Sequence, residues 1–272
     1  SSMYYQDLCA NEQEHKSGPQ FNNSSIKPSN PRHGQNKKRC SSTDPQARLS
    51  RKPHKALNLN YLAQISVDTS SHVICGALAS LADKRDSLCL PDILAQARTN
   101  LYPMGITISQ VLADTNYSSG RSLRHLEDLN IQGYIPCMGN YLPKRTNFTF
   151  HPKENYYQCY KGVKLPFKYI RTDHRDNTRT RIYESSGKDC KDCSLKAACL
   201  GKKNFKHLED TIDKAYYDRM YQRIHTPIGK RMIKLRSSTV EPVLGTLLHY
   251  RGMKKVYTKG IKLANKHVLL AS

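Results

Sequence analysis

Apolar residues begin to follow a regular pattern at Tyr61. Two apolar runs, 61–67 and 72–78, are separated by Asp68-Thr-Ser-Ser71, whose residues favour a turn. This pattern predicts an antiparallel hairpin. A helix is predicted over 91–100, because Pro91 is compatible with a first helical turn.

The pattern continues with a buried strand over 106–113, predicted from its apolar content. Ser118 or Ser119 would then cap a helix that carries Leu123 and Leu126 on one face. Another strand is predicted at 134–135. The order strand, strand, helix, strand, helix, strand indicates an α/β fold.

Beyond residue 140 the composition changes. Residues 141–205 combine Tyr, Phe, Lys, Arg and Cys with many turn formers, which predicts an inserted subdomain of short strands and loops. Four-residue spacing of Ile212, Tyr216 and Met220 predicts a helix within 208–235. Two further helices are predicted, over 238–250 and 260–270.

These patterns divide the chain into four regions. Residues 1–58 are rich in Asn, Ser, Gln, Pro, Lys and His, so they cannot offset their ordering entropy by burial and are expected to form a disordered arm. We expect the core to begin at 59–140, to be interrupted by the cysteine-containing insertion at 141–205, and to finish with the helical part at 206–272.

Charge indicates the class of partner. The 272 residues include 44 Lys and Arg against 22 Asp and Glu, a formal net charge of +22. Such an excess favours a polyanionic partner, most simply nucleic acid. The sequence contains no apolar run of the roughly 20 residues that span a bilayer and no secretory leader at its start, so we expect a cytoplasmic protein with no membrane partner.

Cysteines form one compact group. Cys190-Lys-Asp-Cys193 is followed by Cys199 and preceded by Cys159, a set that could hold a structural Zn²⁺. The alternatives are an iron–sulfur cluster or unliganded buried thiols. An odd total of nine cysteines argues against a disulfide framework. Cys75, Cys89 and Cys137 are expected in the core.

Two acidic residues, Asp114 and Glu241, are candidates for chemistry. Asp114 follows the strand predicted over 106–113, and the carboxyl ends of strands are where α/β sheets place their sites. Taken alone, Asp114 is better explained as part of a simple turn into the next helix. Glu241 borders an apolar helical stripe, and Ser238-x-x-Glu241 also matches a capping box at a helix start.

Basic residues flank Glu241 on both sides. They could hold a DNA backbone, although most charge runs are solvated helix faces. The candidate DNA-binding residues are Lys230, Arg231, Lys234, Arg236, Arg251, Lys254 and Lys255. Tyr156, Tyr157 and Tyr160 could stack on bases, but the core of a small β insertion is the favoured interpretation.

Five blocks in order resemble the DDE transposases of bacterial insertion sequences, in the branch with a cysteine-bearing insert before the glutamate. They are Thr43-Asp-Pro-Gln-Ala-Arg48, Tyr61-x-Ala-Gln-Ile-x-Val-Asp68, Leu112-Ala-Asp-Thr-Asn-Tyr-Ser118, Thr226-Pro-x-Gly-Lys230 and Arg236-Ser-Ser-Thr-Val-Glu-Pro-Val-Leu-Gly-Thr246. The resemblance runs from about residue 42 to residue 272.

This resemblance implies an RNase-H-like mixed sheet and Mg²⁺-dependent (or Mn²⁺-dependent) phosphodiester hydrolysis and strand transfer by two metal ions. Asp114 and Glu241 would be the second and third metal-binding carboxylates. The partners would be double-stranded DNA, at transposon ends and target, and a second copy of the chain. A bacterial, nucleoid-associated location would follow.

The sequence departs from the family at the first carboxylate. The family carries it in an Asp-Gly-Thr block on a first strand, which is absent here; Asp7 lacks the Gly, and Asp44 and Asp68 match non-catalytic positions. We therefore expect a sheet that lacks or replaces its first strand, in a truncated and inert copy. The alternatives are a non-enzymatic, zinc-stabilised DNA-binding remnant and a basic α/β protein without a nucleic-acid role.

Overall fold

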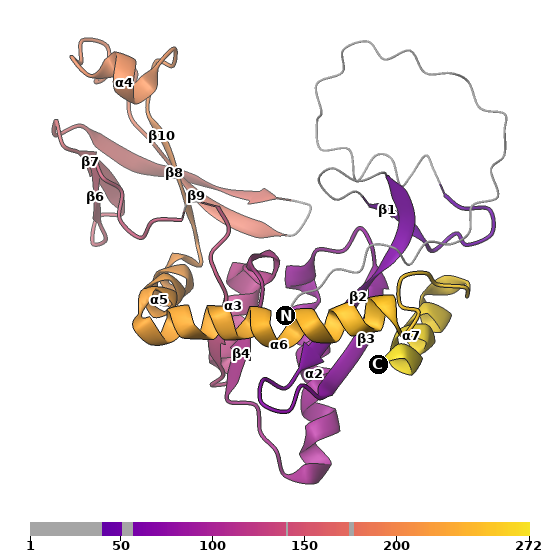
Figure 1. The fold of residues 1–272 in the computed structure, drawn as a ribbon. Helices are drawn as coiled ribbons and strands as arrows, with labels where there is room; N and C mark the ends of the chain where they lie inside the picture. The colour runs from indigo at the N-terminus through magenta and orange to yellow at the C-terminus, as the bar shows by residue number, and fades with distance from the viewer. Residues whose placement is uncertain (1–39, 51–56, 140, 174–176) are drawn as a thin grey trace.

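The computed structural model describes residues 40–50, 57–139, 141–173 and 177–272. It is a mixed α/β fold, as predicted. A five-stranded sheet lies at one end, a three-stranded sheet with the C-terminal helix lies at the other, and one long helix runs between them (Figure 1).

The predicted hairpin is confirmed. β2 (Asn58–Val67) pairs antiparallel with β3 (Ile74–Leu81), and β1 (Arg48–Ser50) pairs with the start of β2. Asp68 closes the turn: its Oδ2 accepts hydrogen bonds from the backbone N–H and the hydroxyl of both Ser70 and Ser71, at 2.7–3.1 Å. These bonds hold the pKa of the Asp68 carboxyl well below its usual range.

Helix α7 (Gly260–Ala271) covers this hairpin and is tied to residues far back in the chain. Asp44 Oδ2 accepts hydrogen bonds from Tyr61 Oη at 2.7 Å and from the Gly260 N–H at 3.1 Å. Gln46 Oε1 accepts from the Ile261 N–H at 2.8 Å. Burial, reinforced by the bond to Asp44, raises the pKa of Tyr61. Together these bonds satisfy the first backbone donors of α7.

The predicted arm over 1–58 falls largely on residues 1–39 and 51–56, which lie outside the described residues. The part that is described differs from the expectation. Asp44 is only 1% exposed, and β1 is paired with β2. Ala47 and Leu49 are buried against the hairpin, so this part of the chain has apolar contacts that its overall polar composition did not predict.

A second layer contains the predicted helix, here α2 (Leu90–Leu101), and two short strands that pair in parallel, β4 (Gln110–Leu112) and β5 (Gln132–Tyr134). β4 is therefore much shorter than the strand predicted over 106–113. α3 (Gly120–Asp128) joins the two strands, and Ser119 Oγ accepts from the Ser122 N–H at 3.1 Å, which confirms the predicted cap. Short 3-10 helices lie at Asp86–Leu88, Tyr102–Met104 and Thr115–Tyr117.

The region predicted as an insertion over 141–205 forms most of an antiparallel five-stranded sheet in the order β10-β9-β8-β7-β6, whose strand β10 lies beyond residue 205. Its apolar face is built from Tyr157, Leu165, Tyr183 and Leu208. Tyr157 is thus a core residue, as favoured, whereas Tyr160 is exposed. The strands are β6 (Phe148–His151), β7 (Tyr156–Cys159), β8 (Lys164–Asp173), β9 (Thr178–Glu184) and β10 (His207–Thr211), with the short helix α4 (Lys196–Leu200) between the last two.

Two of the three helices predicted beyond residue 205 have the wrong boundaries, whereas α7 (Gly260–Ala271) confirms the helix predicted over 260–270. Residues 207–211 form a strand because they pair with β9, and α5 (Lys214–His225) follows. α6 (Pro227–His249) is continuous through Ser238, so Ser238 and Glu241 do not form a capping box. The helix begins one residue after Thr226, whose Oγ1 accepts from the Gly229 N–H at 3.0 Å.

α6 also contains Pro242, which removes one intrahelical donor without ending the helix. On the preceding turn, Ser238 Oγ and Thr239 Oγ1 donate to the Leu235 carbonyl at 3.0 and 2.9 Å. Buried Leu244 and Leu247 anchor the second half of the helix against the hairpin and α7. Packing on both sides of Pro242 therefore keeps the two halves in one helix.

Candidate nucleic-acid and metal sites

Asp114 lies at the turn that follows β4. It caps the 3-10 helix Thr115–Tyr117: Oδ1 accepts from the Thr115 N–H at 2.7 Å, and Oδ2 accepts from Asn116 Nδ2 at 3.0 Å. The carboxylate is partly exposed. The turn predicted from sequence is therefore present, and its carboxylate remains accessible at the end of a strand, where α/β sheets commonly bind ligands.

A buried polar chain that sequence reasoning missed fixes this turn. Tyr117 Oη donates to Gln64 Oε1, and Gln64 Nε2 donates to Asp86 Oδ1 at 3.1 Å. All three residues are at most 3% exposed. Since buried polar groups are costly without partners, this chain locks the Asp114 turn to β2 and to the 3-10 helix before α2.

Glu241 lies in the middle of α6 on its exposed face. Its side chain is 55% exposed, and Oε1 accepts from the guanidinium of Arg236 at 3.4 Å. Lys230, Lys234 and Glu241 are spaced by four and seven residues, so they share one stripe of the helix. Glu241 is thus presented to solvent beside cationic side chains rather than directed into the core.

One pocket connects the two acidic regions. It has a volume of about 380 Å³ and lies between the end of β2, the strand β4, and helices α2 and α6. Ala113 and Val240, the residues immediately before Asp114 and Glu241, both line it, as does Arg236. The two carboxylates themselves are not among the lining residues, so they lie next to the pocket walls rather than inside it.

Within the described residues, no three His, Cys, Asp or Glu side chains are placed to share a metal ion. Asp68 also lines the pocket, but its Oδ2 is already occupied by four donors from Ser70 and Ser71. Among the described residues, the carboxylates at this pocket are therefore Asp114 and Glu241 beside its walls and Asp68 in its lining, where one of the two Asp68 oxygens is engaged by the hairpin turn.

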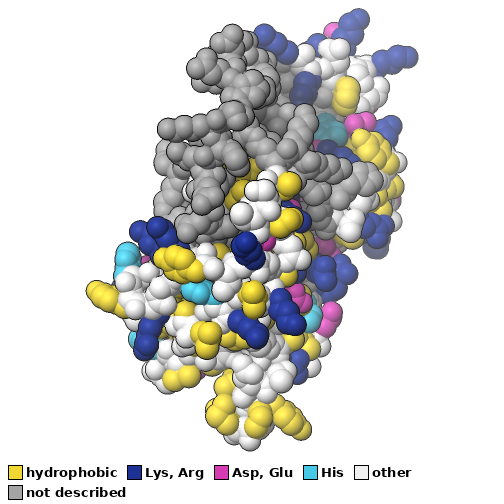
Figure 2. Space-filling model, turned by 90° about the vertical axis from the view of Figure 1, so that its right-hand side faces the viewer, with side chains coloured by type: hydrophobic (Ala, Val, Ile, Leu, Met, Phe, Trp, Pro, Cys, Tyr) yellow, Lys and Arg dark blue, Asp and Glu magenta, His cyan; other side chains and the backbone are white. Residues whose placement is uncertain are grey.

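Six of the seven candidate DNA-binding residues are exposed and form no ion pair within the described part of the chain. They are Lys230, Arg231 and Lys234 on α6, and Arg251, Lys254 and Lys255 after it. Arg236 differs, because it is largely buried and bonded to Glu241. On the face turned toward the viewer in Figure 2, Lys and Arg side chains are spread widely and few acidic ones lie among them.

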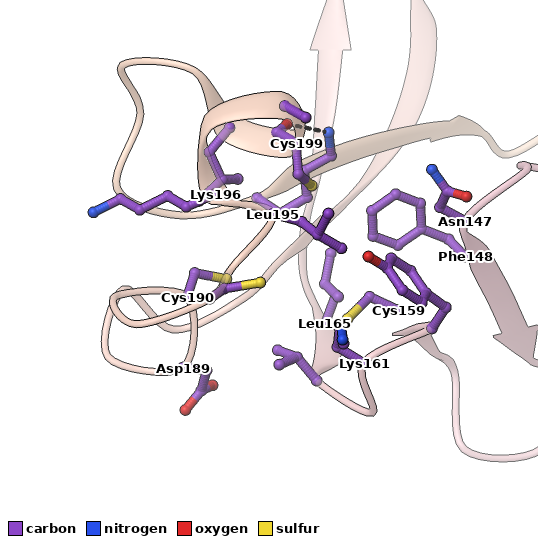
Figure 3. A pocket seen from close by; sticks show the side chains of 16 residues that line it. Asn147, Phe148, Cys159, Lys161, Leu165, Asp189, Cys190, Leu195, Lys196 and Cys199 are labelled. Atoms are coloured by element: carbon purple, nitrogen blue, oxygen red, sulfur yellow. Dashed lines mark hydrogen bonds between the residues drawn. The ribbon is translucent and has the colours of Figure 1, made fainter.

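The structure brings all four predicted zinc-binding cysteines to one pocket. Cys159 comes from the end of β7, Cys190 and Cys193 from the segment after β9, and Cys199 from α4 (Figure 3). Of the cysteines expected in the core, Cys89 is buried, and Cys75 and Cys137 are half-buried. Burial raises the pKa of the Cys89 thiol, and that of Cys137 to about 11, so both are weak nucleophiles.

No helix in the described residues is long and apolar enough to cross a bilayer. Comparison with curated proteins and with solved structures found no match. A family model does match the C-terminal part. Residues 158–272, from β7 to the end of α7, are similar to the transposase DDE domain; this match includes Glu241 and all four cysteines of the pocket, but it does not reach Asp114.

Proposed function

We propose that this protein is a DDE-type transposase that acts on double-stranded DNA, at transposon ends and target sites. The observation that carries the proposal is the placement of Ala113 and Val240 in one pocket, which brings the Asp114 turn and the Glu241 segment together from 127 positions apart. The similarity of residues 158–272 to a transposase DDE domain supports it independently.

An RNase-H-like arrangement is the fold we propose for the catalytic part. The antiparallel hairpin β2–β3, the parallel pair β4–β5 and the helices α2 and α6 are compatible with it. In this arrangement the pocket between β2 and β4 is the position that a further strand would occupy. The five-stranded sheet with its cysteine segment is then an insertion between β5 and α5.

Asp114 and Glu241 have the right donor chemistry for Mg²⁺, because Mg²⁺ prefers oxygen ligands and is often held by one or two carboxylates with water. Among the described residues they do not complete the three-carboxylate set that the resemblance implies, since Asp68 matches a non-catalytic position of the family and its Oδ2 is engaged by the hairpin turn. The proposed metal-dependent phosphodiester hydrolysis and strand transfer need a third carboxylate, so we expect the 272-residue chain to lack strand-transfer activity.

The exposed cations of α6 and of residues 251–255 are proposed to hold the DNA backbone. A stripe that places Lys230 and Lys234 on the same face as Glu241 would bring phosphates to the carboxylate. Such binding releases counterions, so it should weaken steeply with salt. A homodimer and a location with the bacterial nucleoid in the cytoplasm complete the proposal.

DNA binding is tested by a mobility-shift titration of a duplex at two salt concentrations. Combined Lys230→Ala and Lys234→Ala substitutions should weaken binding and lower the slope of log affinity against log salt by about one for each phosphate that is no longer neutralised. Lys153→Ala with Lys161→Ala, on exposed residues of the inserted sheet, is the matched control. Equal DNA binding by the two double variants would contradict the proposal that Lys230 and Lys234 on α6 contact the DNA backbone.

The carboxylates are tested separately with Mn²⁺, which replaces Mg²⁺ and can be followed by electron paramagnetic resonance. Asp114→Asn and Glu241→Gln should each weaken Mn²⁺ binding by the purified chain, while Glu154→Gln, an exposed control, should not. A chain that binds no Mn²⁺, or variants that bind it as the parent does, would rule out this role.

The alternative is a DNA-binding remnant without catalysis, stabilised by zinc. Two observations fit this remnant and an inactive transposase equally: Asp68 is engaged in the hairpin turn, and the basic residues are exposed. The two proposals separate on the carboxylates. DNA binding that persists with unchanged affinity in Asp114→Asn and Glu241→Gln, together with no Mn²⁺ binding by the parent, selects the remnant.

A further inference from the structure

The segment between β9 and β10 has almost no core of its own. Of residues 185–206, only Ser185 and Leu200 are buried, and the only helix there, α4, spans five residues. A segment that buries so little apolar surface gains little hydrophobic stabilisation of its own, and a cross-link or a metal ion can supply what is missing. The sheet strands on either side, in contrast, are fully paired along their length.

Four thiols surround the space that this segment encloses. The pocket has a volume of about 240 Å³, and Cys159, Cys190, Cys193 and Cys199 line it together with apolar side chains such as Phe148, Leu165 and Leu195. Figure 3 shows Cys159 on the sheet side of the pocket and Cys190 and Cys199 on the side of the segment. The cysteines therefore come from both walls.

Few bonds hold the segment in its present position. Cys190 Sγ lies 3.2 Å from Ser185 Oγ. Lys206 takes part in three bonds: its N–H donates to Ser185 Oγ at 2.9 Å, its Nζ donates to the Cys199 carbonyl at 3.0 Å, and its carbonyl accepts from the Ser185 N–H at 3.0 Å. The four thiols are not yet close enough to share one ion among the described residues. Closing the segment onto Cys159 would break few hydrogen bonds.

We propose that Cys159, Cys190, Cys193 and Cys199 bind one structural Zn²⁺, which draws the segment onto the inserted sheet. Thiolates are preferred zinc ligands, and Cys-x-x-Cys supplies two of them from a single turn. Each thiol loses its proton on binding, and the resulting complex carries a net charge of −2. Neighbouring cations offset this charge: Lys188, Lys191, Lys196, Lys202 and Lys203.

This inference does not rest on the proposed function, since a zinc-held segment is compatible with an active, an inactive or a non-catalytic chain. The test is elemental analysis of the full chain purified without chelator, followed by Co²⁺ exchange. We expect about one zinc per chain and, after exchange, the absorption of tetrahedral Co²⁺ with thiolate ligands. Cys190→Ser and Cys199→Ser should each lose the metal, and Cys75→Ser, a half-buried cysteine outside the pocket, should keep it.

Circular dichroism of each variant separates loss of the metal from loss of the fold. Native-like spectra with no zinc in Cys190→Ser and Cys199→Ser support the site, as does recovery of thiol reactivity by alkylation when the parent is treated with chelator. A parent chain without zinc, zinc retained by both variants, or a coloured iron–sulfur chromophore in place of zinc would overturn it.

Discussion

The Asp114 turn and the cysteine segment both present side chains suited to ions, but they are held in opposite ways. The turn is locked from beneath by Tyr117 and Gln64, and α3, α5 and β5 pack around it. The segment after β9 is tethered by a few polar bonds and covers an open pocket. Burial organises the first region, whereas for the second region we propose that a bound metal ion supplies the order.

This contrast explains why the two regions differ in sequence character. Burial needs apolar and matched polar residues, which the regions around β2 and β4 supply. A segment organised by a metal needs only ligands and turn residues, so its remaining positions can be polar and cationic. Perturbing the first region should destabilise the whole fold, and perturbing the second should affect only the segment.

The largest expected effect on stability comes from removing a buried side chain between α6 and the β2–β3 hairpin. Leu244 is fully buried, so Leu244→Ala should lower the free energy of unfolding by about 3 kcal/mol, from reduced transfer energy and the cavity left behind. Chemical denaturation measures it. Leu263→Ala, at a residue that is 42% exposed on α7, is the control and should change stability little. Equal effects would mean that Leu244 does not anchor α6.

A smaller loss is expected at the polar chain beneath Asp114. Gln64→Leu keeps the volume but removes the amide that links Tyr117 to Asp86, and should cost about 2 kcal/mol of unfolding free energy. Gln132→Leu, at an exposed position on β5, should be nearly neutral. If Gln64→Leu leaves the free energy of unfolding unchanged, the hydrogen bonds from Gln64 to Tyr117 and Asp86 do not hold the turn.

Chelation should affect the cysteine segment without affecting the core. Removal of zinc should speed trypsin cleavage after the lysines of 188–203 severalfold, while the denaturation midpoint of the rest of the chain stays the same. Mass mapping of the first cleavage sites gives the result. A matching fall in the midpoint would show that the segment and the core form one cooperative unit, against the independence expected of the two regions.

The smallest effect should be a pH dependence at the edge of the inserted sheet. His207 Nδ1 lies 3.0 Å from Glu184 Oε1, and Nε2 lies 2.9 Å from Glu209 Oε1; these bonds raise the pKa of His207. Because the pKa of His207 is raised in the folded state, its protonated form stabilises that state. This stabilisation is complete when the pH is below the ordinary pKa of 6.5, and it is lost as the pH rises through the raised pKa.

Because these side chains are partly exposed, the contribution should stay under about 1 kcal/mol. Hydrogen exchange of the β9 and β10 amides between pH 6 and 8 detects it. Burial alone would raise the pKa of Glu209, but the hydrogen bonds that it accepts from His207 and Arg171 lower it. The contribution of Glu209 to folding stability should therefore be lost only on strong acidification. His207→Gln should abolish the change near neutral pH; if the variant keeps it, another group is responsible.

Local signals predicted the local structure well. The turn at Asp68, the helix beginning near Pro91 and the Ser119 cap all depend on neighbouring residues, and all three are present. The Ser238-x-x-Glu241 pattern failed because a similar local signal, Thr226-Pro227, lies twelve residues earlier, and continuous packing carried the helix past Ser238. A local motif could not show which of the two starts is used.

Interactions between distant residues account for what the sequence did not reveal at the site. The four cysteines were grouped from their spacing, and they line one pocket, but among the described residues no three of them lie close enough to share an ion, so the metal stays a proposal. Gln64, Asp86 and Tyr117 were not anticipated, because their partnership joins polar residues that are up to 53 positions apart. Each looks like an ordinary polar residue until the chain is folded.

The bonds from Asp44 and Gln46 to the first turn of α7 have a consequence for biosynthesis. They join residues more than 210 positions apart, so this end of the molecule cannot close until residues 260 and 261 have been synthesised. Until residue 260 is made, the apolar side of the hairpin that α7 will cover stays open to water and to other nascent chains. Chaperone demand during translation should therefore concentrate on the β2–β3 hairpin, which is made long before the helix that covers it.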